Sequence, residues 1–216
     1  MKIRAAAFDL DGLMFDTEET YLKVSTALLA RRGKIYTEEL SNAVLGRSGR
    51  FTFELFKEVF GFPETWQELQ AESDRLFIEF LDDGFSPMPG LYELLEFLEQ
   101  RSIPKGICTS SVFPVASEVL RREGIANRFN FVLTIEDVVH PKPDPEMYLK
   151  AASRFGIDPS EMLVLEDSVA GCRAAHNAGA YGIVVRAQHN ALFSFPEAKK
   201  VVASLDDPQI KELVWA

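Results

Sequence analysis

The sequence AAAFDLDGLMFDTEET, residues 5–20, opens on an apolar run and then carries two aspartates separated by one residue, Asp9 and Asp11. The apolar run over residues 3–8 predicts a buried strand that ends at these acids. Residues two apart on an extended chain point the same way, so both carboxylates can face one pocket. Gly12 allows the chain to turn away without placing a side chain in the approach.

Predicted helices fill the segment after this strand. Apolar residues recur at helical spacing over residues 18–32. Three further helices are expected, at 37–45, 50–60 and 65–82. The segment SPMPG, residues 86–90, then interrupts the pattern with two prolines and a glycine. We therefore expect an all-helical cap domain over residues 17–87, inserted into a core domain of residues 1–16 and 88–216.

Beyond this interruption, predicted helices and short apolar strands alternate. The strands are expected at 104–109, 131–134, 162–166, 182–185 and 200–203. The helices are expected at 90–101, 112–123, 145–155 and 168–178, with Asp144 and Pro145 as the N-cap and first residue of the third. This alternation is typical of an α/β fold, and it predicts a Rossmann-like parallel sheet with helices on both faces and the inserted cap.

Composition limits the classes of function. The 216 residues are 47% hydrophobic and 26% charged, which is ordinary for a globular protein. A net charge of -10 without a basic tract argues against a nucleic-acid partner. Cys108 and Cys172 are far apart and do not resemble a disulfide scaffold or a zinc site. No stretch approaches a membrane span or the apolar core of a signal peptide. We expect a monomeric, cytoplasmic protein with no membrane partner.

Chemistry-bearing residues follow four of the predicted strands, at the edge where parallel sheets bind ligands. They are Asp9 and Asp11, then Thr109, Ser110 and Ser111, then Lys142, and finally Glu166 and Asp167. Each group alone has an ordinary interpretation as a turn, a helix cap or a solvated lysine. Together, carboxylates suit Mg²⁺, and hydroxyls, N–H groups and a lysine suit a phosphate. The combination predicts phosphoryl transfer.

The motifs FDLDG (8–12), ICTSS (107–111), HPKPDPEMYL (140–149) and LVLEDSVAG (163–171) occur in this order. With them the sequence resembles, over essentially the whole chain, the haloacid dehalogenase superfamily, in the branch with a helical cap that includes β-phosphoglucomutase-like enzymes and sugar-phosphate phosphatases. The resemblance implies that Asp9 attacks phosphorus and carries an aspartyl-phosphate. It implies that Asp11 protonates the leaving oxygen and later deprotonates water.

The resemblance also implies a cofactor, Mg²⁺. The Asp9 carboxylate, the Asp11 main-chain carbonyl and Asp167 would hold the ion, with Glu166 close by or acting through water. Thr109 and Lys142 would bind the transferring phosphoryl group as catalytic residues, and Lys142 would also offset the carboxylates.

Substrate selection is expected to depend on the cap. Arg47 or Arg50, in LGRSGR (45–50), can bind a second anionic or hydroxyl-rich part of the substrate, and two solvated arginines at a helix start are an equal alternative. Ser110 and Ser111 are expected to join Thr109 in binding the phosphate. Similar proteins with this cap mostly act on small phosphorylated sugars, so a small phosphorylated metabolite is the expected partner.

Departures from the family pattern separate its branches. Asp11 argues against the halide-removing branch, and the phosphonate-cleaving branch would need Lys23 as its Schiff-base lysine. In β-phosphoglucomutase a histidine follows the Asp-Thr pair by five residues, whereas here Tyr21 stands at that distance from Asp16. Water is therefore the favoured acceptor, and Tyr21 either contacts substrate or packs in its helix.

The loop before Lys142 also departs from the pattern. Pro141 replaces the glycine usual there and is expected to stiffen the loop. His140 beside it is either a substrate contact or, more in keeping with an exposed loop, a residue without a role in the site.

We therefore predict a Mg²⁺-dependent phosphatase of a small phosphate monoester, with a sugar phosphate as the substrate. The alternative enzyme is a sugar-phosphate mutase. A third interpretation is a phosphate-responsive regulatory protein that uses the aspartyl-phosphate site without turnover.

Overall fold

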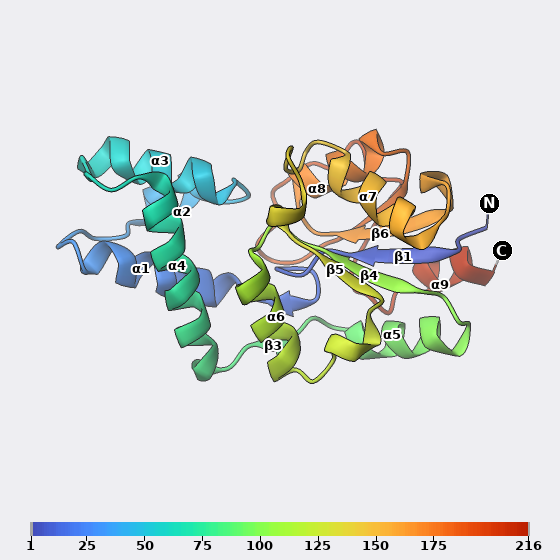
Figure 1. Cartoon of the computed structure of the whole chain (residues 1–216). Coiled ribbons are helices and arrows are strands. Elements are labelled where there is room, and N and C mark those ends of the chain that lie inside the picture. The colour runs from blue at the N-terminus through green and yellow to red at the C-terminus, as the bar shows by residue number, and fades with distance from the viewer. Residues whose placement is uncertain (1, 216) are drawn as a thin grey trace. The chain divides into compact units, whose positions relative to one another are not determined.

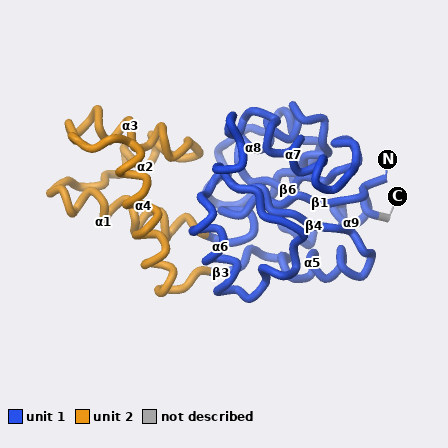
Figure 2. Tube along the Cα trace, viewed as in Figure 1, with its two compact units in different colours: residues 1–16, 86–216 blue, residues 17–85 orange. Residues whose placement is uncertain are grey.

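The computed structural model of this protein describes residues 2–215. The chain divides into two compact units, which Figure 2 colours separately. The first unit contains the chain up to Asp16 and from Ser86 onward, and the second unit is Thr17–Phe85.

The first unit is built on a six-stranded sheet in which every neighbouring pair is parallel. In spatial order the strands are β5 (Phe131–Leu133), β4 (Lys105–Cys108), β1 (Ala5–Phe8), β6 (Met162–Glu166), β7 (Tyr181–Val185) and β8 (Lys200–Val202). The three central strands, β4, β1 and β6, are buried along their whole length, as expected for apolar strands covered on both faces. The predicted α/β fold is confirmed.

Helices cover both faces of the sheet (Figure 1). On one face lie α5 (Leu91–Gln100) and α6 (Phe113–Arg122), and on the other lie α7 (Glu146–Phe155) and α8 (Val169–Asn177). Tyr148 and Ala151 of α7 and Ala174 of α8 belong to one buried cluster with Ala7 and Val164 of the sheet. Small alanines let these two helices approach the strands closely, and the large Tyr148 ring is buried in the same cluster.

The second unit is helical. Its elements are α1 (Glu18–Ala30), α2 (Glu38–Val44), α3 (Gly49–Phe60), α4 (Trp66–Phe80) and the short 3₁₀ helix η1 (Leu81–Asp83). The capping box that the sequence predicts at the start of α4 is present, with Thr65 and Glu68 bonded reciprocally. Helices α1 and α4 pack together and bury Leu28 and Phe77.

A short antiparallel pair lies where the chain leaves and re-enters the first unit. Strand β2 (Phe15–Asp16) pairs with β3 (Ser86–Pro87). Because β3 is bonded to β2, the second unit ends at Phe85 and not at Pro87, where the sequence analysis put the boundary.

Other elements differ from the sequence prediction. The N-cap of α7 is Pro145, so the predicted N-cap Asp144 lies one position before it and accepts a bond from the Glu146 N–H. The C-terminal helix α9 (Pro208–Trp215) was not predicted, nor were the 3₁₀ turns η2 (Ala126–Arg128), η3 (Ile135–Asp137) and η4 (Pro159–Glu161). Among the described residues, no helix combines the length and apolar character that a membrane crossing requires.

Candidate active site

Asp9 and Asp11 follow β1 at the carboxyl end of the sheet. The Asp9 N–H donates to Leu165 O at 3.0 Å, which continues the β1–β6 pairing and fixes Asp9 beside the end of β6. Asp9 is buried, with 7% of the residue exposed. Gly12 has φ +77°, and a Cβ added there would collide with Asp167 Oδ2. Both the turn and the acid across from it therefore require glycine.

The hydroxyl residues follow β4. Thr109 is buried, and its N–H donates to Leu133 O at 2.9 Å. The Thr109 hydroxyl accepts from the Ser111 N–H at 3.0 Å, and the Ser111 hydroxyl donates to Asp11 Oδ2 at 2.6 Å. Thr109 Oγ1 lies 3.5 Å from the same oxygen. The structure thus brings Thr109 and Ser111 to Asp11, whereas Ser110 is exposed.

Lys142 lies among the acids. Its Nζ donates to Asp9 Oδ1 at 2.6 Å, to Glu166 Oε1 at 2.6 Å and to Cys108 O at 2.8 Å. Burial by itself would lower the pKa of Lys142, but the charges of Asp9 and Glu166 outweigh it and leave the pKa raised. The ammonium therefore stays charged and offsets part of the negative charge around it.

Glu166, at the end of β6, is held by protein donors on both oxygens. Oε1 also accepts from the Tyr148 hydroxyl at 2.6 Å. Oε2 accepts from the Asp167 N–H at 3.2 Å, the Ser168 N–H at 3.2 Å and the Ser168 hydroxyl at 2.9 Å. These bonds fix the carboxylate at the first turn of α8, where the helix dipole favours negative charge.

Asp167 is fixed by the loop after β7. His189 Nε2 lies 2.7 Å from Asp167 Oδ2. The buried Asn190 side chain donates to Asp167 O at 2.9 Å and to Val185 O at 3.0 Å, and it accepts from the Ala187 N–H at 2.9 Å. The loop therefore holds both the main chain and the side chain of this acid.

Sequence reasoning did not single out Tyr148, His189 or Asn190. Tyr148 lies inside a quoted motif, but its role depends on the packing of α7. His189 and Asn190 follow the predicted strand at 182–185, whose carboxyl end reaches the same edge of the sheet. Both residues could therefore be expected near the site from their place after a predicted strand.

The acids fit a divalent cation. Asp9, Glu166 and Asp167 are buried, and each offers a carboxylate oxygen within 4.8 Å of the others. Burial raises the pKa of Asp9 well above its ordinary value, and it raises that of Asp167 to about 6, with the charge of Glu166 adding to both. Three buried carboxylates beside a single ammonium call for further positive charge, and oxygen ligands suit Mg²⁺.

The cap arginines pack within their own unit. The Arg47 guanidinium lies 5.1 Å from the centroid of the Phe51 ring. That of Arg50 lies 5.6 Å from the Trp66 ring, and Arg50 Nε donates to Glu54 at 2.9 Å. These contacts account for both side chains without a substrate, so their predicted role in substrate binding stays a prediction.

Tyr21 and Lys23 on α1 also have local contacts. The Tyr21 ring packs against Phe77, with ring centroids 4.6 Å apart. Lys23 lies 3.2 Å from Asp83 and 3.4 Å from Glu19, and the hydrogen bond to Asp83 raises the pKa of Lys23. A Schiff-base lysine needs the opposite shift, which argues against the phosphonate-cleaving interpretation.

His140 is held by its own loop. The ring atom Nδ1 lies 3.2 Å from Glu146 Oε2, and the main-chain N–H of His140 donates to the same oxygen at 2.8 Å. This favours the interpretation of His140 as an exposed residue outside the site.

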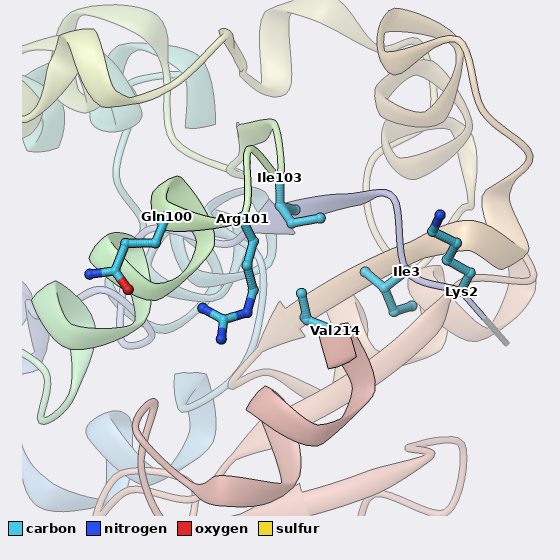
Figure 3. A pocket seen from close by; sticks show the side chains of 6 residues that line it. All are labelled: Lys2, Ile3, Gln100, Arg101, Ile103 and Val214. Atoms are coloured by element: carbon cyan, nitrogen blue, oxygen red, sulfur yellow. The ribbon is translucent and has the colours of Figure 1, made fainter. Parts of the chain in front are cut away.

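A hollow of about 560 Å³ lies beside Ile3 and Ile103, which precede β1 and β4 (Figure 3). Asp9 follows β1, at the other end of the strand. Its lining side chains are Lys2, Ile3, Gln100, Arg101, Ile103 and Val214. None of these side chains is an acid, a thiol or a hydroxyl, whereas the acids and hydroxyls described above follow the carboxyl ends of the strands.

The family model described as haloacid dehalogenase-like hydrolase matches residues 6–185. The chain belongs to this family. This haloacid dehalogenase-like hydrolase is similar to a curated protein, the phosphorylated carbohydrates phosphatase of Thermotoga maritima. The two sequences are 32% identical over 189 residues, which cover 84% of this chain and 86% of that protein. Similarity to a protein with that name supports a phosphoric monoester hydrolase.

Solved structures of similar proteins share the fold of this haloacid dehalogenase-like hydrolase. A CbbY variant from Rhodobacter sphaeroides, in complex with xylulose-1,5-bisphosphate, gives a TM-score of 0.87 at 22% identity, covering 95% of this chain and 96% of that chain. β-Phosphoglucomutase from Clostridium difficile gives 0.81 at 24% identity, covering 98% and 97%.

Proposed function

We propose that this hydrolase is a Mg²⁺-dependent phosphatase that cleaves a small phosphate monoester, a sugar phosphate, through an aspartyl-phosphate on Asp9. The observation that carries the proposal is the buried group of Asp9, Lys142, Glu166 and Asp167 at the ends of β1 and β6. A nucleophile, a cation and metal-binding acids in one place are what phosphoryl transfer requires.

The residues that would hold Mg²⁺ are the Asp9 carboxylate, the Asp11 main-chain carbonyl and the Asp167 carboxylate. We place Glu166 beside the ion and not on it, because protein donors already occupy both of its oxygens. When bound, Mg²⁺ would neutralise charge on the phosphoryl oxygens.

The chain's own residues supply the reaction. An Asp9 oxygen forms a bond to phosphorus as the ester P–O bond breaks. The electron pair of the broken P–O bond goes to the leaving oxygen. That oxygen takes a proton from the Asp11 carboxyl. In the second half a water oxygen bonds to phosphorus, its proton goes to Asp11, and the bond from phosphorus to Asp9 breaks. Lys142 and Thr109 orient the phosphoryl group throughout.

The choice of a sugar phosphate draws on the name of the Thermotoga maritima phosphatase and on the cap. Arg47 and Arg50 are the proposed contacts to the sugar portion. Tyr21, and not a histidine, occupies the position expected of a mutase, and its ring packs against Phe77, which supports water as the acceptor.

The test is phosphate release from a panel of sugar and nucleoside monophosphates, with Mg²⁺ and with EDTA. Asp9→Asn is the inactive variant, and Asp158→Asn, at the exposed N-cap of η4, is the matched acid control. We expect Mg²⁺-dependent release on the sugar phosphates, lost in Asp9→Asn and kept in Asp158→Asn. Isomerised sugar phosphate without free phosphate would contradict the phosphatase and indicate the mutase. A stable phosphoenzyme without turnover would indicate a regulatory protein.

A further inference from the structure

The contact between Ser111 and Asp11 links two strand ends. The Ser111 hydroxyl lies 2.6 Å from Asp11 Oδ2, whereas the Thr109 hydroxyl lies 3.5 Å from the same oxygen. A distance of 2.6 Å is typical of a well-formed bond in which a hydroxyl donates to a carboxyl oxygen. The single hydroxyl proton of Ser111 is therefore directed at Asp11 and not at a phosphate oxygen.

The main chain of Ser111 is fixed on both sides. Its N–H donates to Thr109 Oγ1 at 3.0 Å, and its carbonyl accepts from the Ile135 N–H at 3.3 Å. The residue is half-buried, and it is tied to β4 through Thr109 and to the turn after β5 through Ile135. A hydroxyl on so well-held a backbone can set the position of a neighbouring side chain.

We infer that Ser111 is a positioning residue for Asp11, and not a phosphate ligand as the sequence motif predicted. The inference rests on the proposed function and deepens it. Ser111 fixes Asp11 through Oδ2, which leaves Oδ1 as the atom that exchanges the proton. In the first half, Oδ1 delivers its proton to the leaving oxygen as the ester P–O bond breaks. In the second half, Oδ1 takes the proton of the attacking water.

The two roles differ in how rates depend on the leaving group. A phosphate ligand binds every ester alike, so its loss lowers the rates for all esters by the same factor. A residue that positions the acid matters only where the leaving oxygen needs a proton. An alkyl alcohol needs one, whereas nitrophenolate leaves without one.

The experiment measures single-turnover release of the alcohol, with Mg²⁺ present, from an alkyl phosphate and from p-nitrophenyl phosphate. The variants are Ser111→Ala, Ser111→Thr, which keeps the hydroxyl, and Ser117→Ala. The control removes a serine of α6 whose hydroxyl donates within its own helix, to Pro114 O at 3.1 Å. We expect Ser111→Ala to lose about 10- to 100-fold on the alkyl ester and under about threefold on the nitrophenyl ester.

Ser111→Thr is expected to recover most of the rate on the alkyl ester, and Ser117→Ala is expected to match the wild type on both. Equal losses on the two esters in Ser111→Ala would overturn the inference and leave the phosphatase intact, as would an unchanged rate on both. A wild-type protein that releases neither alcohol would instead overturn the proposed function, and the inference with it. Thermal unfolding of each variant shows that the comparison is made between folded proteins.

Discussion

The Lys142 ammonium lies 2.6 Å from both Asp9 Oδ1 and Glu166 Oε1, and it is buried with them. Removing one partner of a buried ion pair costs much more than the pair contributes, because the remaining charges are left without compensation. A substitution of Lys142 alone therefore tests how much the ammonium compensates the charges of Asp9 and Glu166 in the folded protein.

Lys142→Met should destabilise the metal-free protein by about 3–5 kcal/mol, because Asp9 and Glu166 then face each other without the ammonium. Thermal unfolding in EDTA measures the loss. The matched control is Lys150→Met on α7, which removes a half-buried ion pair with Glu146 and a hydrogen bond to Asp137 O, and should cost about 1–2 kcal/mol. Equal losses in the two variants would contradict this account of the charge balance.

Asp167→Asn should change the pH dependence of stability. Burial raises the pKa of Asp167 to about 6, so the folded protein keeps a proton that the unfolded chain has lost. The contribution of this group to the free energy of unfolding therefore falls as the pH rises from about 4 to above 6.

In EDTA, Asp167→Asn should then unfold at a higher temperature than the wild type at about pH 8, and the difference should shrink towards about pH 5. Thermal unfolding at both pH values measures it. A difference that does not change with pH would contradict the prediction.

At the scale of elements, the start of α8 lies against the end of β6. Gly171 is buried in the first turn of this helix, and a Cβ added there would overlap the Glu166 carboxylate. The helix can therefore come close enough to hold Glu166 only because this residue has no side chain.

Gly171→Ala should lower the stability, although alanine in place of glycine in a helix interior usually raises it by about 1 kcal/mol. It should also lower the turnover rate, because Glu166 holds Lys142. The matched control is Gly49→Ala in α3, where the atoms nearest to the added Cβ belong to the flexible end of Gln70. A Gly171→Ala protein as stable and active as the control would argue against a tight fit at α8.

The elements also show how far the sequence could predict the fold. Strands such as β1 and β6 are continuous apolar runs that end at acids, so local pattern was sufficient. The pair of β2 and β3 has two residues in each strand, at Phe15–Asp16 and Ser86–Pro87, and depends on contacts between distant parts of the chain. Periodicity carries no information about such pairs.

At the scale of the whole molecule, the site combines residues from four strand ends that the chain order separates widely. The positions of Asp9, Thr109, Lys142 and Asp167 could be expected because parallel strands end at one edge. The partners that orient these residues could not be expected from the sequence. The bonds from Tyr148 to Glu166 and from Ser111 to Asp11 depend on how closely the helices and loops pack against the strand ends.

The division into two units predicts that the cap affects substrate choice more than chemistry. Arg47→Ala should lower kcat/KM for the best sugar phosphate by about tenfold or more and leave p-nitrophenyl phosphate within about twofold. Steady-state kinetics on both esters measures this, with Lys57→Ala, on the same helix as Phe51, as the control. Equal losses on the two esters would remove Arg47 from substrate recognition.

The most direct test of the central claim is to trap the phosphoryl group on the enzyme. The protein is mixed with Mg²⁺ and the best substrate, quenched in acid, and treated with borohydride, which reduces an aspartyl-phosphate to homoserine. Peptide mass spectrometry then reads residue 9. The account predicts homoserine at Asp9 in the wild type with substrate, and none without substrate or in Asp9→Asn. Turnover with unmodified Asp9, or with the modification on another acid, would contradict it.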